Sequence, residues 1–276
     1  MGFFADRASE MKRRKTSAWA SLGDLRRAIE ISAEGAARAA RDGDIQGAAF
    51  LRGNILGIRF DVGEWDEALR EANSLIGAPG FNRQEYLARS VRAIILDSRG
   101  EPAAAEVDFE LAVASARESA EAAAVLPALV GLAGFHRRQG RTGEVAAALD
   151  EVVAGLDASE SVGDIQEFHV ELVVELLNAD RAEAAERIVG RMPAGPWRDA
   201  CRALVDGEDA RAADTLASIG TERLAAELRL RSARAFASAG RLSEAETQLE
   251  LGRAFFRKVG ATAFLAEADT IVAAAS

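Results

Sequence analysis

The chain is short of the residues on which most enzyme chemistry depends. Its 276 residues include one cysteine, Cys201, and two histidines, His136 and His169. A lone cysteine excludes an intramolecular disulfide and favours a reducing compartment. Neither histidine stands at a spacing that builds a zinc site. There is no GxxxxGK[ST] phosphate-binding loop either. We therefore expect no catalytic residue, no metal and no cofactor.

Long apolar runs are also missing, and the charge is of the wrong sign for nucleic acid. No run approaches the roughly 20 residues that span a bilayer. The start, MGFFADRASEMKRRK, places its basic cluster after the apolar residues, which is the wrong order for a secretory signal. The net charge of −10 disfavours nucleic acids and anionic membranes. These features predict a cytoplasmic protein without a membrane span.

Lysine, proline and aromatic residues are scarce, whereas alanine is abundant. Three lysines and five prolines stand against 60 alanines, and aromatic residues make up 6% of the chain. Good helix formers with small side chains favour an all-α fold in which helices approach closely. The same composition suggests a GC-rich coding sequence from a bacterium.

A short phrase recurs six times along the chain. A small residue is followed five positions later by a small apolar residue and, in five of the six copies, four positions later by a charged residue, usually Glu, as in GEWDEA at 63–68 and GRLSEA at 240–245. A recurrence of this size indicates a repeat array. The first residues of the phrase, called anchors below, are Gly63, Gly100, Gly140, Ala179, Gly207 and Gly240.

The phrase predicts the turn of a helical hairpin. After Gly63, apolar residues at helical spacing (Trp65, Ala68, Leu69, Ala72) form one stripe of an amphipathic helix. Glycine reaches the left-handed conformation of a helix C-cap without steric cost. We expect helical hairpins at 44–77, 83–118, 121–157, 163–191, 196–219 and 221–257. Helices at about 18–41 and 260–274 would cap the two ends of the stack.

Residues 1–17 show no sustained helical stripe. They read as a flexible N-terminal extension ahead of a single domain at 18–276. The alternative is an amphipathic anchor in which Phe3, Phe4 and Met11 insert into a membrane surface beside the basic run 12–15.

The spacing of Gly, Glu-Ala and a bulky residue around each turn resembles the tetratricopeptide repeat (TPR). That resemblance implies a right-handed superhelical α-solenoid of about six TPR-like hairpins. The stretches GEWDEALREANSLI, GPWRDACRALVDGEDARAADTLASIG and RKVGATAFLAEAD carry a second resemblance, over about 42–274. They are similar to the C-terminal helical-repeat region of bacterial signalling proteins with class III nucleotide cyclase and ATPase domains, and of related ATP-dependent transcription regulators. Both resemblances imply a scaffolding or regulatory array.

In TPR arrays the residues ten and six places before each anchor point into a concave groove. Counted onto this sequence, most of these positions are apolar or small, so the groove would favour an apolar ligand segment. Closure of the superhelix over the groove is the alternative. The positions are Gly53, Gly57, Ser90, Ile94, Val130, Gly134, His169, Val173, Trp197, Cys201, Leu230 and Arg234. Of these, Ser90, Ile94, Val130, His169, Val173, Trp197 and Arg234 are our candidate partner-binding residues.

Several other residues could have either a functional or a structural role. Trp197 could be an exposed interface anchor or a core residue. Cys201 reads as a small buried hydrophobe, and His136 as a helix-terminal residue whose positive ring would suit the dipole. Glu171 and Glu175 share a helix face and read as a solvated acidic pair. Four arginines could receive a carboxylate or phosphate, or form a solvated face with salt-bridge partners: Arg52, Arg59, Arg89 and Arg92.

The sequence as a whole predicts a non-enzymatic TPR-like module that binds a protein or peptide partner in bacterial signalling. A cyclase or ATPase signalling protein is the partner that the resemblance suggests. The alternative is a self-associating repeat protein that forms dimers or filaments. An enzyme with an unrecognised site would require His169 and a carboxylate to converge in one pocket.

Overall fold

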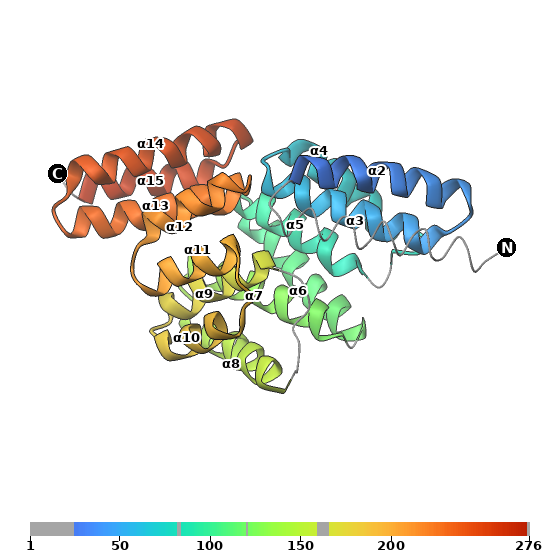
Figure 1. Ribbon diagram of the computed structural model, residues 1–276, viewed down its shortest axis with the longest axis horizontal. Helices are drawn as coiled ribbons and strands as arrows, with labels where there is room; N and C mark the ends of the chain where they lie inside the picture. The colour runs from blue at the N-terminus through green and yellow to red at the C-terminus, as the bar shows by residue number, and fades with distance from the viewer. Residues whose placement is uncertain (1–24, 82–83, 120, 159–165, 275–276) are drawn as a thin grey trace.

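The computed structural model describes residues 25–81, 84–119, 121–158 and 166–274 (Figure 1). Within these ranges the chain forms α-helices joined by short turns, and it contains no strand. The all-α expectation is therefore confirmed for this part of the chain. The proposed extension at 1–17 lies outside the described residues.

Each range that was expected to hold a pair of helices contains two. They are α3 (Ile45–Asp61) and α4 (Trp65–Leu75), α5 (Glu85–Ser98) and α6 (Pro102–Ser119), α7 (Ala122–Arg138) and α8 (Thr142–Ala158), α9 (Gln166–Asn178) and α10 (Ala182–Arg191), α11 (Pro196–Val205) and α12 (Asp209–Ser218), and α13 (Glu222–Ser238) and α14 (Leu242–Val259). Before them lies α2 (Leu25–Arg41), and after them α15 (Thr262–Ala274).

The turns follow the anchors closely. The five anchor glycines have φ between +71° and +86°, the left-handed region in which a side chain would clash with the backbone. In each of these turns the next helix begins two residues after the glycine. The recurring glycine is therefore explained by turn geometry alone.

The fourth turn corrects the alignment made from the sequence. The residue in the left-handed conformation there is Asp180, with φ +57°, and not the expected anchor Ala179. Asp and Asn tolerate this conformation better than most residues because their short polar side chains bond locally. With Asp180 as the anchor, the small apolar residue five places later becomes Ala185, which is fully buried, whereas Ala184 is half-buried. The phrase ADRAEA had been aligned one residue too early.

Two large hydrophobic cores hold the helices together. The first, called the middle core, gathers buried residues between Val113 and Leu228 from helices that follow one another along the chain. The second, called the end core, joins residues between Ala49 and Ile95 to residues between Ala226 and Ile271. In Figure 1 the chain descends from α2–α5 through the middle helices and returns, so that α13–α15 lie beside α3–α5.

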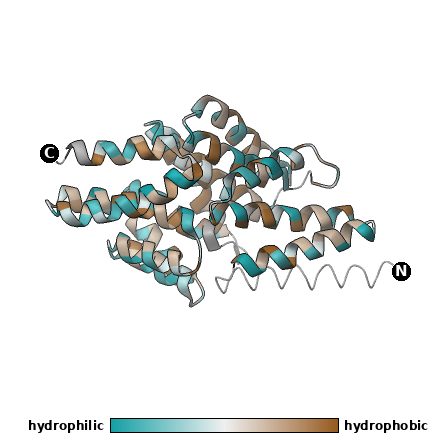
Figure 2. Ribbon diagram, turned by 90° about the horizontal axis from the view of Figure 1, so that it is seen from above, coloured by the Kyte–Doolittle hydropathy of each residue, from teal (hydrophilic) through white to brown (hydrophobic). Residues whose placement is uncertain are grey.

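Apolar and polar residues alternate along the helices, as expected for helices with one buried side (Figure 2). Among the described residues, none of the helices combines the length and the apolar character needed to cross a bilayer.

Candidate binding cleft

A charged cleft opens between α7 and α9 on one side and α13 and α15 on the other. Its volume is about 310 Å³, and a second hollow of about 480 Å³ shares Arg137, Arg138, Arg234, Phe264 and Glu267 with it. We call the first of these the cleft. Its charged lining residues are Arg137, Arg138, Glu171, Glu175, Asp209, Glu227, Arg231, Arg234 and Glu267.

The repeat register explains why these helices line the cleft. Counted from the corrected anchor Asp180, the positions ten and six places earlier are Val170 and Val174, and both line it. The same positions before Gly240 are Leu230 and Arg234, which also line it. Val170 and Leu230 are fully buried, so of these four positions only Val174 and Arg234 offer surface to the cleft, and the concave register stays a prediction.

Ion pairs line each side of the cleft, and a hydrogen bond between Arg231 and Asn178 joins the two sides. On one side, the Arg137 guanidinium donates to the Glu175 carboxylate at 2.8 Å, and Arg138 donates to Asp97 at 2.5 Å. Gly134 allows the first contact, because an added Cβ there would lie 3.3 Å from a Glu175 oxygen.

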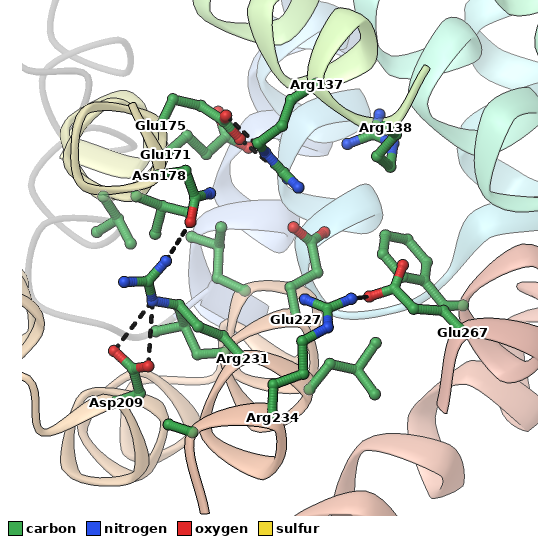
Figure 3. A pocket seen from close by; sticks show the side chains of 17 residues that line it. Arg137, Arg138, Glu171, Glu175, Asn178, Asp209, Glu227, Arg231, Arg234 and Glu267 are labelled. Carbon is green, nitrogen blue, oxygen red and sulfur yellow. Dashed lines mark hydrogen bonds and ion pairs between the residues drawn. The ribbon is translucent and has the colours of Figure 1, made fainter. Parts of the chain in front are cut away.

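On the opposite side, Arg231 on α13 pairs with Asp209 at 3.1 Å and contacts Asn178 on α9. Arg234, also on α13, pairs with Glu267 on α15. Figure 3 shows the arginines of α7 and of α13 entering from opposite sides.

Burial shifts the pKa of two cleft carboxylates upward. The pKa of Glu171 is raised by burial, although Arg223 opposes the shift. The pKa of Asp209 is likewise raised by burial and partly lowered by Arg231. Poor solvation makes these carboxylates depend on cationic partners. The expectation that Glu171 and Glu175 form a solvated acidic pair is wrong, since each is paired with an arginine and Glu175 is only 6% exposed.

The candidate groove residues fall into three groups. Arg234 lines the cleft. Val130, Val173 and Trp197 are 1%, 0% and 1% exposed, so they belong to the middle core and offer no surface. Of the remaining three, Ser90, Ile94 and His169 are half-buried and lie outside the cleft lining. A binding role for this last group stays a prediction.

The other singled-out side chains have structural surroundings. Burial raises the pKa of the Cys201 thiol to about 12, so the group stays protonated at neutral pH. Burial, aided by Arg141, lowers the pKa of His136, which opposes the positive ring expected at this helix end.

The four arginines at the first two repeats are all paired. Arg52 bonds Glu71, Arg59 lies 3.5 Å from Glu64, and Arg89 and Arg92 share Asp108. These contacts support the structural reading of that cluster.

Sequence reasoning missed most of the charged lining. Arg137 and Arg138 were outside the counted register because they stand at the end of α7, next to the turn. Glu227 and Glu267 come from helices distant from α9 in sequence. In the sequence, the spacing of Glu171 and Glu175 on one helix face was the one indication of a charged site. The arginines that pair with these two carboxylates could not be predicted from it.

Comparisons with known proteins do not establish a family. The chain matches no protein-family model, and a comparison with curated proteins found no match. Among solved structures it is similar to a tetratricopeptide repeat protein from Parabacteroides merdae, with 15% identity and a TM-score of 0.39, over 93% of this chain and 99% of that one.

Proposed function

We propose that the chain is a non-catalytic TPR-like scaffold or regulatory module that binds a protein or peptide segment in the cleft. The observation that carries the proposal is the convergence of charged side chains from α7, α9, α12, α13 and α15 on one open space. Convergence of several helices on a concave surface is how repeat proteins build extended binding surfaces.

The lining indicates the chemistry of the partner. Four guanidinium groups and five carboxylates face the cleft, so charges of both signs are available within a short distance. A segment that carries both acidic and basic side chains can form ion pairs with the arginines and with the carboxylates of the lining. A segment with charges of one sign is repelled by the lining residues of the same sign. The earlier expectation of an apolar ligand does not suit this lining.

The reactive groups of the chain support binding over catalysis. The Cys201 thiol is buried and protonated, and the two histidines lie outside the cleft lining. Among the described residues, no group of three or more His, Cys, Asp or Glu side chains is arranged to hold a metal ion. The condition set for an enzymatic reading, His169 beside a carboxylate in one pocket, is unmet in the cleft.

A signalling role is part of the proposal and rests on the resemblance to cyclase and ATPase signalling proteins. The first partner to test is therefore a bacterial protein of that kind. We expect the segment that enters the cleft to be a helix or loop with mixed charge.

The test is quantitative capture with a matched pair of charge reversals. Arg234→Glu reverses a cleft residue that is 48% exposed and paired with Glu267. Arg202→Glu reverses an arginine that is 40% exposed and paired with Glu186 away from the cleft. We expect a bacterial partner found by crosslinking mass spectrometry to be lost at least tenfold with the first variant and retained with the second. Equal capture by both variants would contradict the cleft as the binding site.

Self-association remains the second candidate, because α6 exposes two large apolar side chains one turn apart. Val107 is 54% exposed and Leu111 is 42% exposed. Burying such a pair against a second copy would stabilise a dimer. If this is the function, light scattering after size-exclusion chromatography should show a concentration-dependent dimer that Leu111→Glu abolishes. A strict monomer at all concentrations removes this candidate.

A further inference from the structure

Helices distant in sequence meet at one place, called the junction below. Its hydrogen bonds run from side chains to main-chain carbonyls at helix ends. Lys258 Nζ donates to the Val62 carbonyl at 3.1 Å, and Arg99 Nη2 donates to the Val259 carbonyl at 3.0 Å. Thr262 Oγ1 returns a hydrogen bond to the Arg99 carbonyl at 2.9 Å. The junction therefore ties α3 and α5 to α14 and α15.

Arg223 lies at the base of the junction and connects three helices. Its side chain is 5% exposed, and its guanidinium packs over the Phe60 ring at 4.5 Å. It donates to Asp61 on α3 at 3.1 Å, to Glu171 on α9 at 2.7 Å and to Glu227 on α13 at 3.1 Å. One cation thus joins the N-terminal, middle and C-terminal helices.

The charges in this cluster do not balance. Three carboxylates surround one guanidinium, so full ionisation leaves two uncompensated negative charges. The side chain of Asp61 is 9% exposed, and those of Glu171 and Glu227 are 26% and 29% exposed. Burial raises the pKa of Asp61, with Arg223 opposing and Glu227 adding to the shift. Burial also raises the pKa of Glu171. The pKa of Arg223 rises as well, because the three carboxylates outweigh the effect of its burial.

The neighbouring charged groups do not remove the imbalance. Arg137 on α7 faces Glu227, but its own hydrogen bonds go to Glu175. Lys258 on α14 pairs with Glu222 at 2.6 Å. These neighbours therefore contribute balanced pairs and leave the Arg223 cluster with its excess of acid.

The cluster of Arg223, Asp61, Glu171 and Glu227 shares residues with the cleft. Glu171 and Glu227 line the cleft, one on each of its two sides, while Asp61 lies on α3 outside it. Repulsion among the three carboxylates acts to separate α9, α13 and α3. Since α13 and α15 form one side of the cleft, such a separation would widen it.

We propose that the Arg223 cluster is a proton-operated clamp that sets the width of the cleft. Uptake of a proton by the three carboxylates holds α13–α15 against α3 and α9, and loss of that proton loosens the junction. The clamp would regulate partner binding, a role that rests on the proposed function of the cleft. The movement itself does not depend on any partner.

The direction of the pH effect follows from linkage. The ordinary pKa values are 3.8 for Asp61 and 4.5 for Glu171, and both are raised in the folded chain. At pH values between the ordinary and the raised pKa, the folded chain therefore holds a proton that the unfolded chain has released. The clamp's contribution to stability is fully present below the ordinary values and is lost as pH rises through the raised ones.

The test measures the distance between two spin labels on helices that pack against the two sides of the cleft, α10 on α9 and α14 on α13, without any ligand. Glu183→Cys on α10 and Ser243→Cys on α14 place labels at exposed positions, while Cys201 is buried and unreactive. As the pH is raised from the ordinary values of 3.8 and 4.5 through the raised ones, we expect the distance to lengthen and its distribution to broaden. Glu171→Gln keeps the shape of the side chain but removes one negative charge, and it should at least halve this change.

Two further variants make the outcome decisive. Glu186→Gln, in an exposed pair with Arg202, should leave the pH response unchanged. Asp61→Asn tests the same cluster from α3 if Glu171→Gln loses helicity by circular dichroism. A distance that does not change with pH, or that changes equally in both cluster variants and in the parent, overturns the clamp. Because no partner is present, this result is independent of the capture experiment.

Discussion

The middle core and the end core differ in how far apart their members lie along the sequence. The middle core is filled by helices that follow one another, so each helix packs on neighbours that the repeat pattern brings to it. The end core joins residues near position 60 to residues near position 255, across most of the chain. The first core needs only the local period, whereas the second needs the path of the whole array to return on itself.

The two cores also differ in how much their polar contacts contribute to stability. At the turns of the middle core, the ion pairs are mostly exposed, as between Arg181 and Asp150 or Arg202 and Glu186. In the junction, Arg223 bonds the buried carboxylate of Asp61, and Arg99 and Lys258 bond helix-end carbonyls. Contacts of the second kind are costly to break, because removing one partner leaves a buried charge or carbonyl without its hydrogen bond.

The most severe way to break the junction is Arg223→Ala. The substitution leaves the buried carboxylate of Asp61 and the half-buried carboxylates of Glu171 and Glu227 without their cation, which should cost about 3–5 kcal/mol of unfolding free energy. Urea unfolding followed by circular dichroism measures this. The matched control is Arg202→Ala, whose pair is exposed and should cost under about 1 kcal/mol. Similar losses in the two variants would mean that the junction contributes no more than a surface pair.

A second prediction compares two turns with the same backbone conformation. Gly63 has φ +78°, and an added Cβ would lie 2.6 Å from the Phe255 ring in the end core. Gly140 has φ +71°, but in the described part of the chain no atom lies within 4 Å of an added Cβ.

Both substitutions to Ala strain the backbone, by about 1–2 kcal/mol. Gly63→Ala also overpacks the junction, which adds about 1–3 kcal/mol. Thermal unfolding of the two variants side by side gives the difference. Equal melting temperatures would show that α4 and α14 do not pack as closely as the structure has them.

A third prediction compares the two buried tryptophans. In the end core, Trp65 Nε1 donates to the Phe60 carbonyl at 3.0 Å. In the middle core, Trp197 Nε1 has no hydrogen-bond partner among the residues that the structure describes. Replacement by Phe removes the same volume from both sites, but only Trp65→Phe breaks a hydrogen bond. Trp65→Phe should therefore lower the free energy of unfolding by about 1 kcal/mol more than Trp197→Phe. Denaturant midpoints of the two variants test this, and a larger loss for Trp197→Phe would reverse the assignment.

The smallest effect concerns Cys201 in the middle core. Its pKa is raised from 9.0 to about 12 by burial, so between these values the folded chain keeps a proton that the unfolded chain loses, and stability falls as pH rises. At about pH 8 an aromatic disulfide reagent should leave the native thiol unmodified and react fully after unfolding.

The control for this labelling is Ser218→Cys in a Cys201→Ala background. Ser218 is exposed at the end of α12, so its replacement should react at once. Rapid labelling of native Cys201 would show that the middle core opens more easily than the end core.

Sequence reasoning located the helices well and the site poorly, and particular residues show why. The anchor glycines identified the turns because a left-handed residue is a local requirement. The fourth turn was misplaced by one residue because Asp180, rather than a glycine, supplies that conformation. The same shift moved His169 and Val173 into the candidate groove in place of Val170 and Val174, which line the cleft.

The sequence by itself determined the all-helical character of the described chain, the positions of its turns and the small contact residues between paired helices. These follow from periodicity and backbone conformation, which act over a few residues. Only the tertiary structure decided that α13–α15 return to α3–α5, that Arg223 meets Asp61 and Glu171, and that Arg137 and Glu267 share one cleft. The physical reason is that these contacts depend on small rotations between successive helices, which accumulate along the array and which no local pattern records.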